Sequence, residues 1–181
     1  TLVNNTAKWF PGGTNRIAGT EPSVQFADMF KTGRTDMVVG ASIDAPGPGN
    51  SYVFKNVGGS FQRIEIQSKA WGHDTNVYDL NGDGFKDVII TDYGPNTTFA
   101  INNGVNGFTS LLQRNPNSGI YTASSIAAGD FLGNGSVSLV ATDMGTGKNR
   151  TVLASLNIVP GGVDTAIIAD LPGSRFNLPK W

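Results

Sequence analysis

The chain has 181 residues, of which 39% are hydrophobic and only 15% are charged, and its formal net charge is −1. No run of basic residues offers a surface for phosphates, which argues against nucleic acid as a partner, and no stretch approaches the ~20 apolar residues of a membrane span. The absence of cysteine excludes disulfides and cysteine–zinc sites.

The first predicted elements are short strands. Residues 1–10 resemble the third strand of a sheet unit whose earlier strands are missing, so we expect residues 1–23 to end a unit. The next strands are predicted near 24–28, 37–42, 51–56 and 61–66. Their connectors are rich in Gly, Pro, Asn and Asp, and no window shows helical periodicity. A complete four-stranded unit is therefore predicted over 24–75.

The same unit recurs with a period of about 51 residues. Asp28, Asp79 and Asp130 lie 51 residues apart, and each is followed by a glycine five residues later and then by a short run that is mostly aliphatic. Four short strands in each 40–50-residue unit are typical of a β-propeller blade. We therefore predict a single all-β domain, 1–181, of propeller blades with four antiparallel strands. It comprises three full blades, at 24–75, 76–124 and 125–168, and two half-blades, at 1–23 and 169–181, the last of which starts a further blade or supplies a closing strand.

The second unit contains a candidate calcium loop. Oxygen donors fall at positions 1, 3, 5, 7 and 9 of a nine-residue loop, with glycine at position 6: Asp79, Asn81, Asp83, the Phe85 carbonyl and Asp87. Calcium takes six to eight oxygen ligands, which alternate side chains on a tight loop can supply. The loop is not an EF-hand, because position 12 is Ile90 instead of glutamate. The alternative is a plain hairpin turn, in which three carboxylates would repel one another without a cation.

The corresponding loops of the other two units keep fewer oxygen donors. The first has Phe30 and Thr32 at positions 3 and 5, and the third has Leu132 and Ser138 at positions 3 and 9. We expect these two loops to keep the backbone conformation of the calcium loop without binding a metal.

The calcium loop and the downstream segment 102–108 together resemble the FG-GAP/VCBS repeat, over about residues 24–163. That repeat builds the propellers of integrin α-subunits and of many secreted bacterial and fungal proteins. Within the family, segment 28–36 is similar to the repeats of the calcium-binding β-propeller lectins of mushrooms, which bind N-acetylglucosamine-type sugars. The resemblance implies calcium as cofactor, an extracellular (secreted) location, and a glycan or glycoprotein as partner.

The same resemblance indicates candidate ligand-binding residues. The lectins usually place an aromatic residue and a histidine shortly before the leading aspartate, and Trp71 and His73 fit that pattern. Tyr93 is a further candidate for stacking on a sugar. The other units have Pro22 and Ser124 at the histidine position, so this chain departs from a ring of equal sugar sites. Packing within a blade is the alternative role for these side chains.

The leading hypothesis for function is a calcium-stabilised, lectin-like binding module. The alternatives are the propeller portion of a secreted carbohydrate-active enzyme, such as a polysaccharide lyase or sugar dehydratase, and an integrin-like adhesion module. An enzyme is disfavoured and no catalytic residue is assigned, because one histidine and no basic cluster make a full acid–base set hard to assemble. Open sheet edges also indicate a homo-oligomer, or association with further blades of a longer protein.

Overall fold

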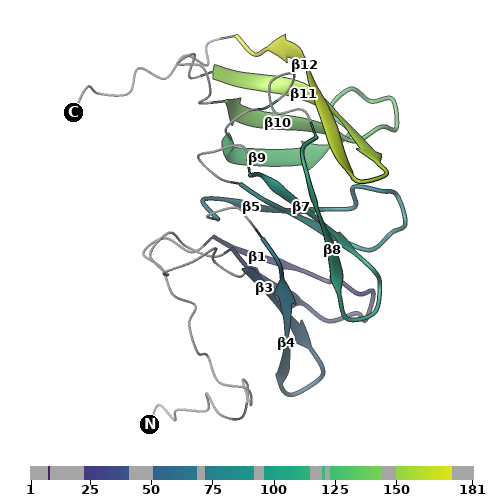
Figure 1. Ribbon diagram of the computed structural model, residues 1–181. Coiled ribbons are helices and arrows are strands. Elements are labelled where there is room, and N and C mark those ends of the chain that lie inside the picture. The colour runs from purple at the N-terminus through teal and green to yellow at the C-terminus, as the bar shows by residue number, and fades with distance from the viewer. Residues whose placement is uncertain are drawn as a thin grey trace, which may run out of the picture.

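The secondary-structure elements of the described part of the chain are all β-strands. The computed structural model describes residue 8 and residues 23–40, 51–68, 72–91, 96–114, 120, 123–143 and 150–172. Within these residues the chain forms twelve β-strands in three four-stranded sheets. Figure 1 shows the three sheets stacked in chain order. The predicted all-β class is confirmed.

Each sheet, called a blade below, is an antiparallel meander in which consecutive strands are neighbours. Blade 1 contains β1 (Val24–Ala27), β2 (Asp36–Val39), β3 (Ser51–Asn56) and β4 (Phe61–Ile66). Blade 2 contains β5 (Thr75–Tyr78), β6 (Asp87–Ile90), β7 (Thr98–Asn102) and β8 (Phe108–Leu112). Blade 3 contains β9 (Ala123–Gly129), β10 (Ser138–Asp143), β11 (Arg150–Val159) and β12 (Gly162–Asp170). The prediction of four antiparallel strands in each full unit is confirmed.

The register of the strands repeats from blade to blade. The second and third strands pair at equivalent positions in all three blades: Val38 with Val53, Ile89 with Phe99, and Val140 with Leu153. Residues 51 apart in the first two strands therefore occupy the same place in successive blades. This equivalence allows the surroundings of one residue to be compared with those of its counterparts.

The burial of each strand depends on its place within the sheet as well as on the neighbouring blades. In β4 only Ile64 and Ile66 are buried, while the residues between and before them face solvent. This alternation is expected for a strand with one covered face. All four residues of β6 are buried, whereas no residue of β8 in the same blade is buried, because β6 lies inside its sheet and β8 lies at the edge.

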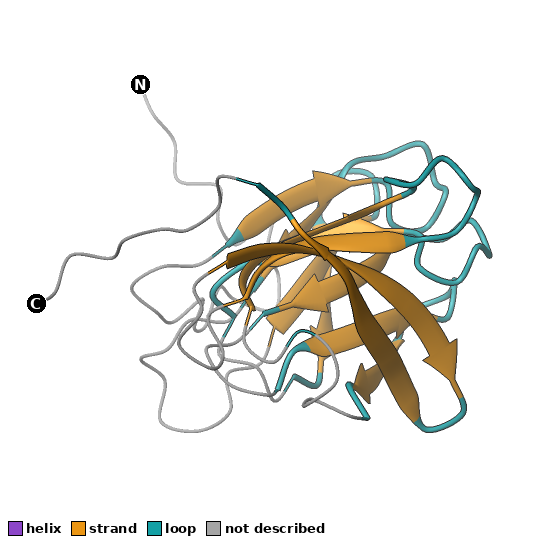
Figure 2. Cartoon of the chain, turned by 90° about the horizontal axis from the view of Figure 1, so that it is seen from above, coloured by secondary structure: helices purple, strands orange, loops and turns teal. Residues whose placement is uncertain are grey.

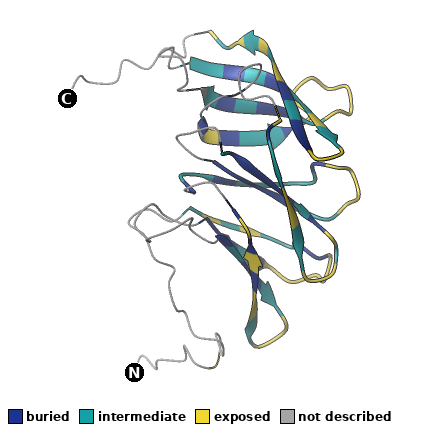
Figure 3. Cartoon of the chain, viewed as in Figure 1, coloured by how far each residue is buried: buried dark blue, intermediate teal, exposed yellow. Residues whose placement is uncertain are grey.

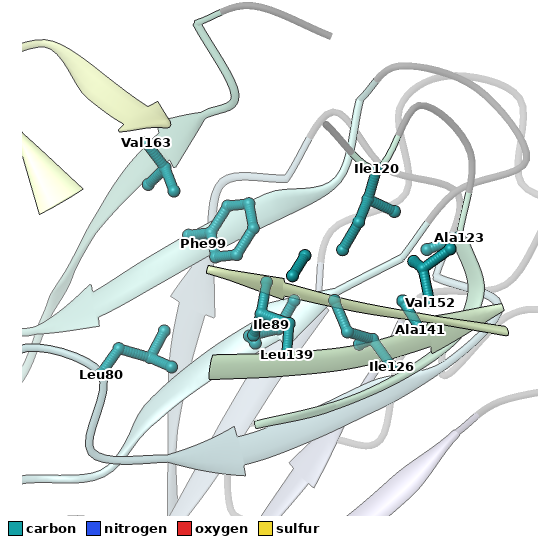
Figure 4. Close-up of a cluster of buried hydrophobic side chains, with 11 residues drawn as sticks. Leu80, Ile89, Phe99, Ile120, Ala123, Ile126, Leu139, Ala141, Val152 and Val163 are labelled. Atoms are coloured by element: carbon teal, nitrogen blue, oxygen red, sulfur yellow. The ribbon is translucent and has the colours of Figure 1, made fainter. Parts of the chain in front are cut away.

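Two apolar cores join the blades. The first combines Met29 and Val38 of blade 1 with Val88 and Ile90 of blade 2. The second joins blades 2 and 3 and includes the buried side chains of Ile89, Phe99, Leu139 and Val152 (Figure 4). The first strands also pack in series, β1 against β5 and β5 against β9. Opposite faces of blade 2 thus contribute to different cores, which is how propeller blades are held together.

The candidate loop lies at one end of its blade. The loop joining the first two strands contacts the hairpin joining the last two, since the backbone N–H of Asn102 donates to Asp87 and that of Asn56 donates to Asp36. Figure 2 shows that these loops gather on one side of the molecule, and Figure 3 shows that this side is rich in exposed residues.

The predicted half-blades lie largely outside the described residues. Ala169 and Asp170, the first residues of the predicted 169–181 segment, which was expected to start a further blade or supply a closing strand, are the last two residues of β12. The three described sheets do not close into a ring. In the described ranges, no helix has the length and apolar character needed to cross a membrane.

Candidate functional site

The candidate calcium loop, residues 79–87, joins β5 to β6 and is held by its own backbone amides. The two carboxylate oxygens of Asp79 accept hydrogen bonds from the N–H groups of Gly82 and Gly84, each at 2.8 Å. Gly82 has a φ of +76° and Gly84 a φ of +83°. Residues with a Cβ rarely adopt this left-handed conformation, so the glycines allow the loop to fold around the Asp79 carboxylate.

The middle of the loop carries two exposed oxygen-bearing side chains, Asn81 and Asp83. Asn81 Oδ1 accepts from the Asp83 N–H at 3.0 Å, and Asn81 Nδ2 donates to Asp83 Oδ2 at 2.9 Å. Asp83 Oδ1 accepts from the Phe85 N–H at 2.8 Å. These contacts are all local, so neither side chain is committed to another element of the fold.

Asp87, at position 9, is fully buried and ties the loop to the neighbouring hairpin. Its oxygens accept the N–H groups of Leu80 at 2.7 Å and Asn102 at 2.8 Å. Burial, together with the nearby carboxylates of Asp83 and Asp79, raises the pKa of the Asp87 carboxyl to about 6, against the lowering effect of those two hydrogen bonds. The three carboxylates therefore share one region of negative potential.

The corresponding loops show which of these residues serve the backbone. Asp28 accepts the N–H groups of Thr32 and Gly33 at 2.9 and 2.7 Å, and Asp130 accepts those of Asn134 and Gly135 at 3.0 and 2.9 Å. Burial raises the pKa of the Asp28 carboxyl, but hydrogen bonds from backbone amides outweigh it, and the net shift is downward. The leading aspartate therefore folds the loop in every described blade.

Position 9 also keeps its structural role in the other blades. Asp36 is fully buried and accepts the N–H groups of Met29 at 2.9 Å and Asn56 at 2.7 Å. Burial raises the pKa of its carboxyl despite these bonds. In blade 3 the hydroxyl of Ser138 accepts the Phe131 N–H at 3.2 Å instead. Of the three loops, only that of blade 2 carries an oxygen-bearing side chain at position 3, Asn81, since Phe30 and Leu132 hold that position in blades 1 and 3.

The chemistry of the donor set in the 79–87 loop fits a hard cation. Its donors are carboxylate, amide and carbonyl oxygens, the kinds that calcium selects. A carboxylate oxygen that accepts one N–H keeps another lone pair for a metal. In the conformation described, no cluster of three or more histidine, cysteine or acidic side chains is gathered at metal-binding separation among the described residues. Calcium therefore stays a prediction for this loop.

Two lysines of blade 1 reach the loops of blade 2, and sequence reasoning did not find them. Lys31 Nζ donates to the Asp83 carbonyl at 3.0 Å and lies 4.2 Å from the centre of the Phe85 ring. Lys55 Nζ donates to the Val105 carbonyl at 2.8 Å. Each lysine lies 52 or 50 residues from its acceptor. Both separations are close to the repeat length of about 51 residues, and this is the sequence signal that could have identified these contacts.

Of the three candidate ligand-binding residues, the structure describes only His73. Trp71 and Tyr93 lie outside the described residues. His73 is half-buried, and its backbone N–H donates to the Thr91 carbonyl at 3.2 Å. Its neighbour Asp74 was not singled out from the sequence.

Asp74 connects all three blades. Its carboxylate accepts the hydroxyl of Ser23 at 3.3 Å and that of Ser125 at 2.8 Å. These three residues are 51 apart, so they hold equivalent positions in the three blades. Both serine side chains contact that of Asp74 where the first strands of the blades pack in series. A buried or half-buried carboxylate with several donors stabilises such a junction.

Blades packed through opposite faces, with a tight aspartate-led loop at one end of each, define a repeat protein of the β-propeller class. The FG-GAP-like repeat family matches the chain twice, over residues 28–90 and 79–141. Each match begins at a leading aspartate and ends in the second strand of the following blade. The chain therefore belongs to the FG-GAP-like repeat family. No curated protein matches it.

Proposed function

We propose that this chain is an extracellular binding module whose second blade takes up calcium and whose ligand is a carbohydrate. One observation carries the calcium part. Three loops share one backbone fold, yet only the 79–87 loop adds Asn81 and Asp83 at positions 3 and 5. Those two side chains are exposed and bond only within the loop, so their oxygens can turn to a cation without unfolding the blade.

Electrostatics also support a cation at this loop. Asp79, Asp83 and Asp87 lie close enough for the first two to raise the pKa of the third. A divalent ion would relieve that repulsion and favour the ionised form of each carboxylate. The ion would act as a structural element, because it would join the loop to β6 through Asp87.

The test of the calcium proposal is thermal unfolding with calcium and with chelator. A ligand that binds only the folded state adds about 2.7 kcal/mol at a concentration of 100 Kd, so wild type should melt higher in calcium. Asp83→Ala should abolish this response. Asn134→Ala is the matched control, because Asn134 stands at position 5 of the blade 3 loop and accepts the Ser136 N–H at 2.9 Å; its calcium response should be unchanged. A wild-type melting temperature that ignores calcium and chelator would contradict the proposal.

The carbohydrate part rests on the resemblance of segment 28–36 to the repeats of propeller lectins and on Trp71 and Tyr93, which flank β5 and β6 in the sequence. An aromatic ring offers an apolar face that suits one side of a pyranose ring. A glycan array in calcium should give selective binding, and Trp71→Ala should weaken it with little loss of stability. The array would exclude the lectin role if folded, calcium-loaded protein bound no glycan. Because melting and glycan binding are separate measurements, either half of the proposal can fail alone.

A further inference from the structure

Every described blade has two apolar faces, one toward the following blade and one toward the preceding blade. Three positions of the following-blade face are buried in both blades that have a successor in the described stack. They are Met29, Val38 and Val53 in blade 1, and Leu80, Ile89 and Phe99 in blade 2, none more than 6% exposed. These side chains form the two cores that join the blades.

The same positions of blade 3 are Phe131, Val140 and Leu153. Phe131 is 49% exposed, and Val140 and Leu153 are only half-buried. Ile168 on β12 is 50% exposed, and Figure 3 shows exposed stretches on that strand at the end of the stack. Blade 3 therefore carries an apolar face of the type that blades 1 and 2 bury.

Blade 1 has the converse property on its preceding-blade face. Phe26 is 66% exposed and Val24 is 40% exposed. In blade 2 the position of Val24 is held by Thr75, which is 1% exposed, and in blade 3 by Ile126, which is 4% exposed. Both ends of the stack therefore present large apolar side chains at positions that are covered within it.

We propose that a second copy of this chain covers both faces, with blade 3 of one copy packed against blade 1 of the other. The argument is continuity with the existing interfaces. Each junction within the chain joins a following-blade face to a preceding-blade face. The faces left at the two ends are one of each kind, so a second copy supplies the complementary face in the geometry already used twice. Each junction pairs unlike faces, and a half-turn between the two copies forms the junction twice and closes the ring with twofold symmetry.

The number of blades favours two copies. Propellers typically have four to eight blades. Two copies contribute six described blades, which lies within that range, whereas three copies contribute nine. The closed assembly is therefore a dimer with two equal junctions.

Polar groups at the junctions repeat in the same way. The Thr75 N–H donates to Ser23 Oγ at 3.1 Å between blades 1 and 2, and the Ile126 N–H donates to Asp74 Oδ2 at 3.3 Å between blades 2 and 3. Ser125 holds the next position of this series and is exposed. Its oxygen keeps lone pairs to accept the N–H of Val24 of the second copy. Apolar and polar contacts thus predict the same register.

The first arm of the experiment measures mass in solution by light scattering and sedimentation over a range of concentrations. Wild type should reach twice the 19.0 kDa chain mass, while Phe26→Asp and Phe131→Asp should each be monomeric with unchanged circular dichroism. Val105→Asp is the control, because Val105 is 64% exposed at the hairpin between β7 and β8 and lies on neither face; it should remain a dimer. A wild type that stays at the chain mass at its highest soluble concentration would overturn the proposal.

The second arm tests the head-to-tail direction by cross-linking. The chain has no cysteine, so single Phe26→Cys and Phe131→Cys chains each carry one thiol. A short bis-maleimide should link a mixture of the two variants into dimers and link neither variant alone. Cross-linking of each variant with itself would indicate a symmetric contact between like faces and would refute the proposed arrangement. Dimers that survive both Asp variants would place the interface elsewhere on the chain and would refute it as well.

Discussion

The structure makes a quantitative prediction about Asn102, a buried residue at the end of β7. Asn102 Nδ2 donates to the Met29 carbonyl of blade 1 at 2.9 Å and to the Lys86 carbonyl at 3.0 Å, and its Oδ1 accepts the Gly104 N–H at 2.9 Å. A net hydrogen bond is worth about 1 kcal/mol, and partners left buried without one cost more. Asn102→Ala should therefore lower the free energy of unfolding by about 3 kcal/mol.

Blade 1 offers a matched comparison for this change. Asn56 has the same position and the same two local bonds, accepting the Gly58 N–H at 3.0 Å and donating to the Thr35 carbonyl at 3.3 Å. It is half-buried, so water can replace its partners, and Asn56→Ala should cost about 1 kcal/mol. Urea denaturation of both variants measures the difference between their losses in free energy of unfolding. We attribute that difference to the bond from Asn102 to the Met29 carbonyl and to the deeper burial of Asn102. Equal losses in the two variants would refute the claim that this side chain stabilises the junction between blades.

Three further changes test other parts of the site. The pKa of Asp87 is raised from 3.8 to about 6 in the folded state, so the folded protein binds more protons than the unfolded chain between these values. In calcium-free buffer, the free energy of unfolding should therefore fall as the pH rises from about 4 to about 6, by about 2 kcal/mol more in wild type than in Asp87→Asn. Asp74→Ala removes the acceptor of Ser125 and should cost about 1–2 kcal/mol in the same denaturation assay. Gly104→Ala should be more destabilising than Gly33→Ala: both have positive φ, but only at Gly104 would the added Cβ lie 2.6 Å from a Phe85 ring atom, while nothing lies within 4 Å at Gly33.

Much of the fold was predictable because the repeat is regular. The strand predicted at 61–66 is present with those bounds, since its apolar residues alternate with Gln62, Arg63 and Glu65. The end of blade 3 was not predictable in this way. Residues 168–170 resemble the start of a repeat, yet they finish a strand of nine residues. The Asp170 carboxylate lies 2.6 Å from the Arg150 guanidinium on β11, and this pair holds the segment against its neighbouring strand.

The candidate site was predictable in its loop but not in its surroundings. The spacing of Asp79, Asp83 and Asp87 identifies a loop of nine residues, and their backbone partners lie within it or on the adjacent hairpin. Lys31 and Asp74 contact other blades, and such contacts depend on how the blades stack. A pattern within one repeat carries no information about that stacking, although separations near 51 residues between polar side chains do.

Comparison of the three loops distinguishes two roles for the leading aspartate, which can fix the backbone of the loop or bind a metal. A leading aspartate with a glycine five residues later is found in every described blade, and each time its oxygens accept the N–H groups that close the loop. The pattern therefore reports backbone shape, and it is positions 3 and 5 that distinguish a loop suited to a metal. Because Asp79 and Asp87 already bind backbone amides, the blade 2 loop has a stable fold before any cation arrives. Calcium would then add an increment to a folded blade, so chelation should lower the melting temperature without unfolding the chain at room temperature.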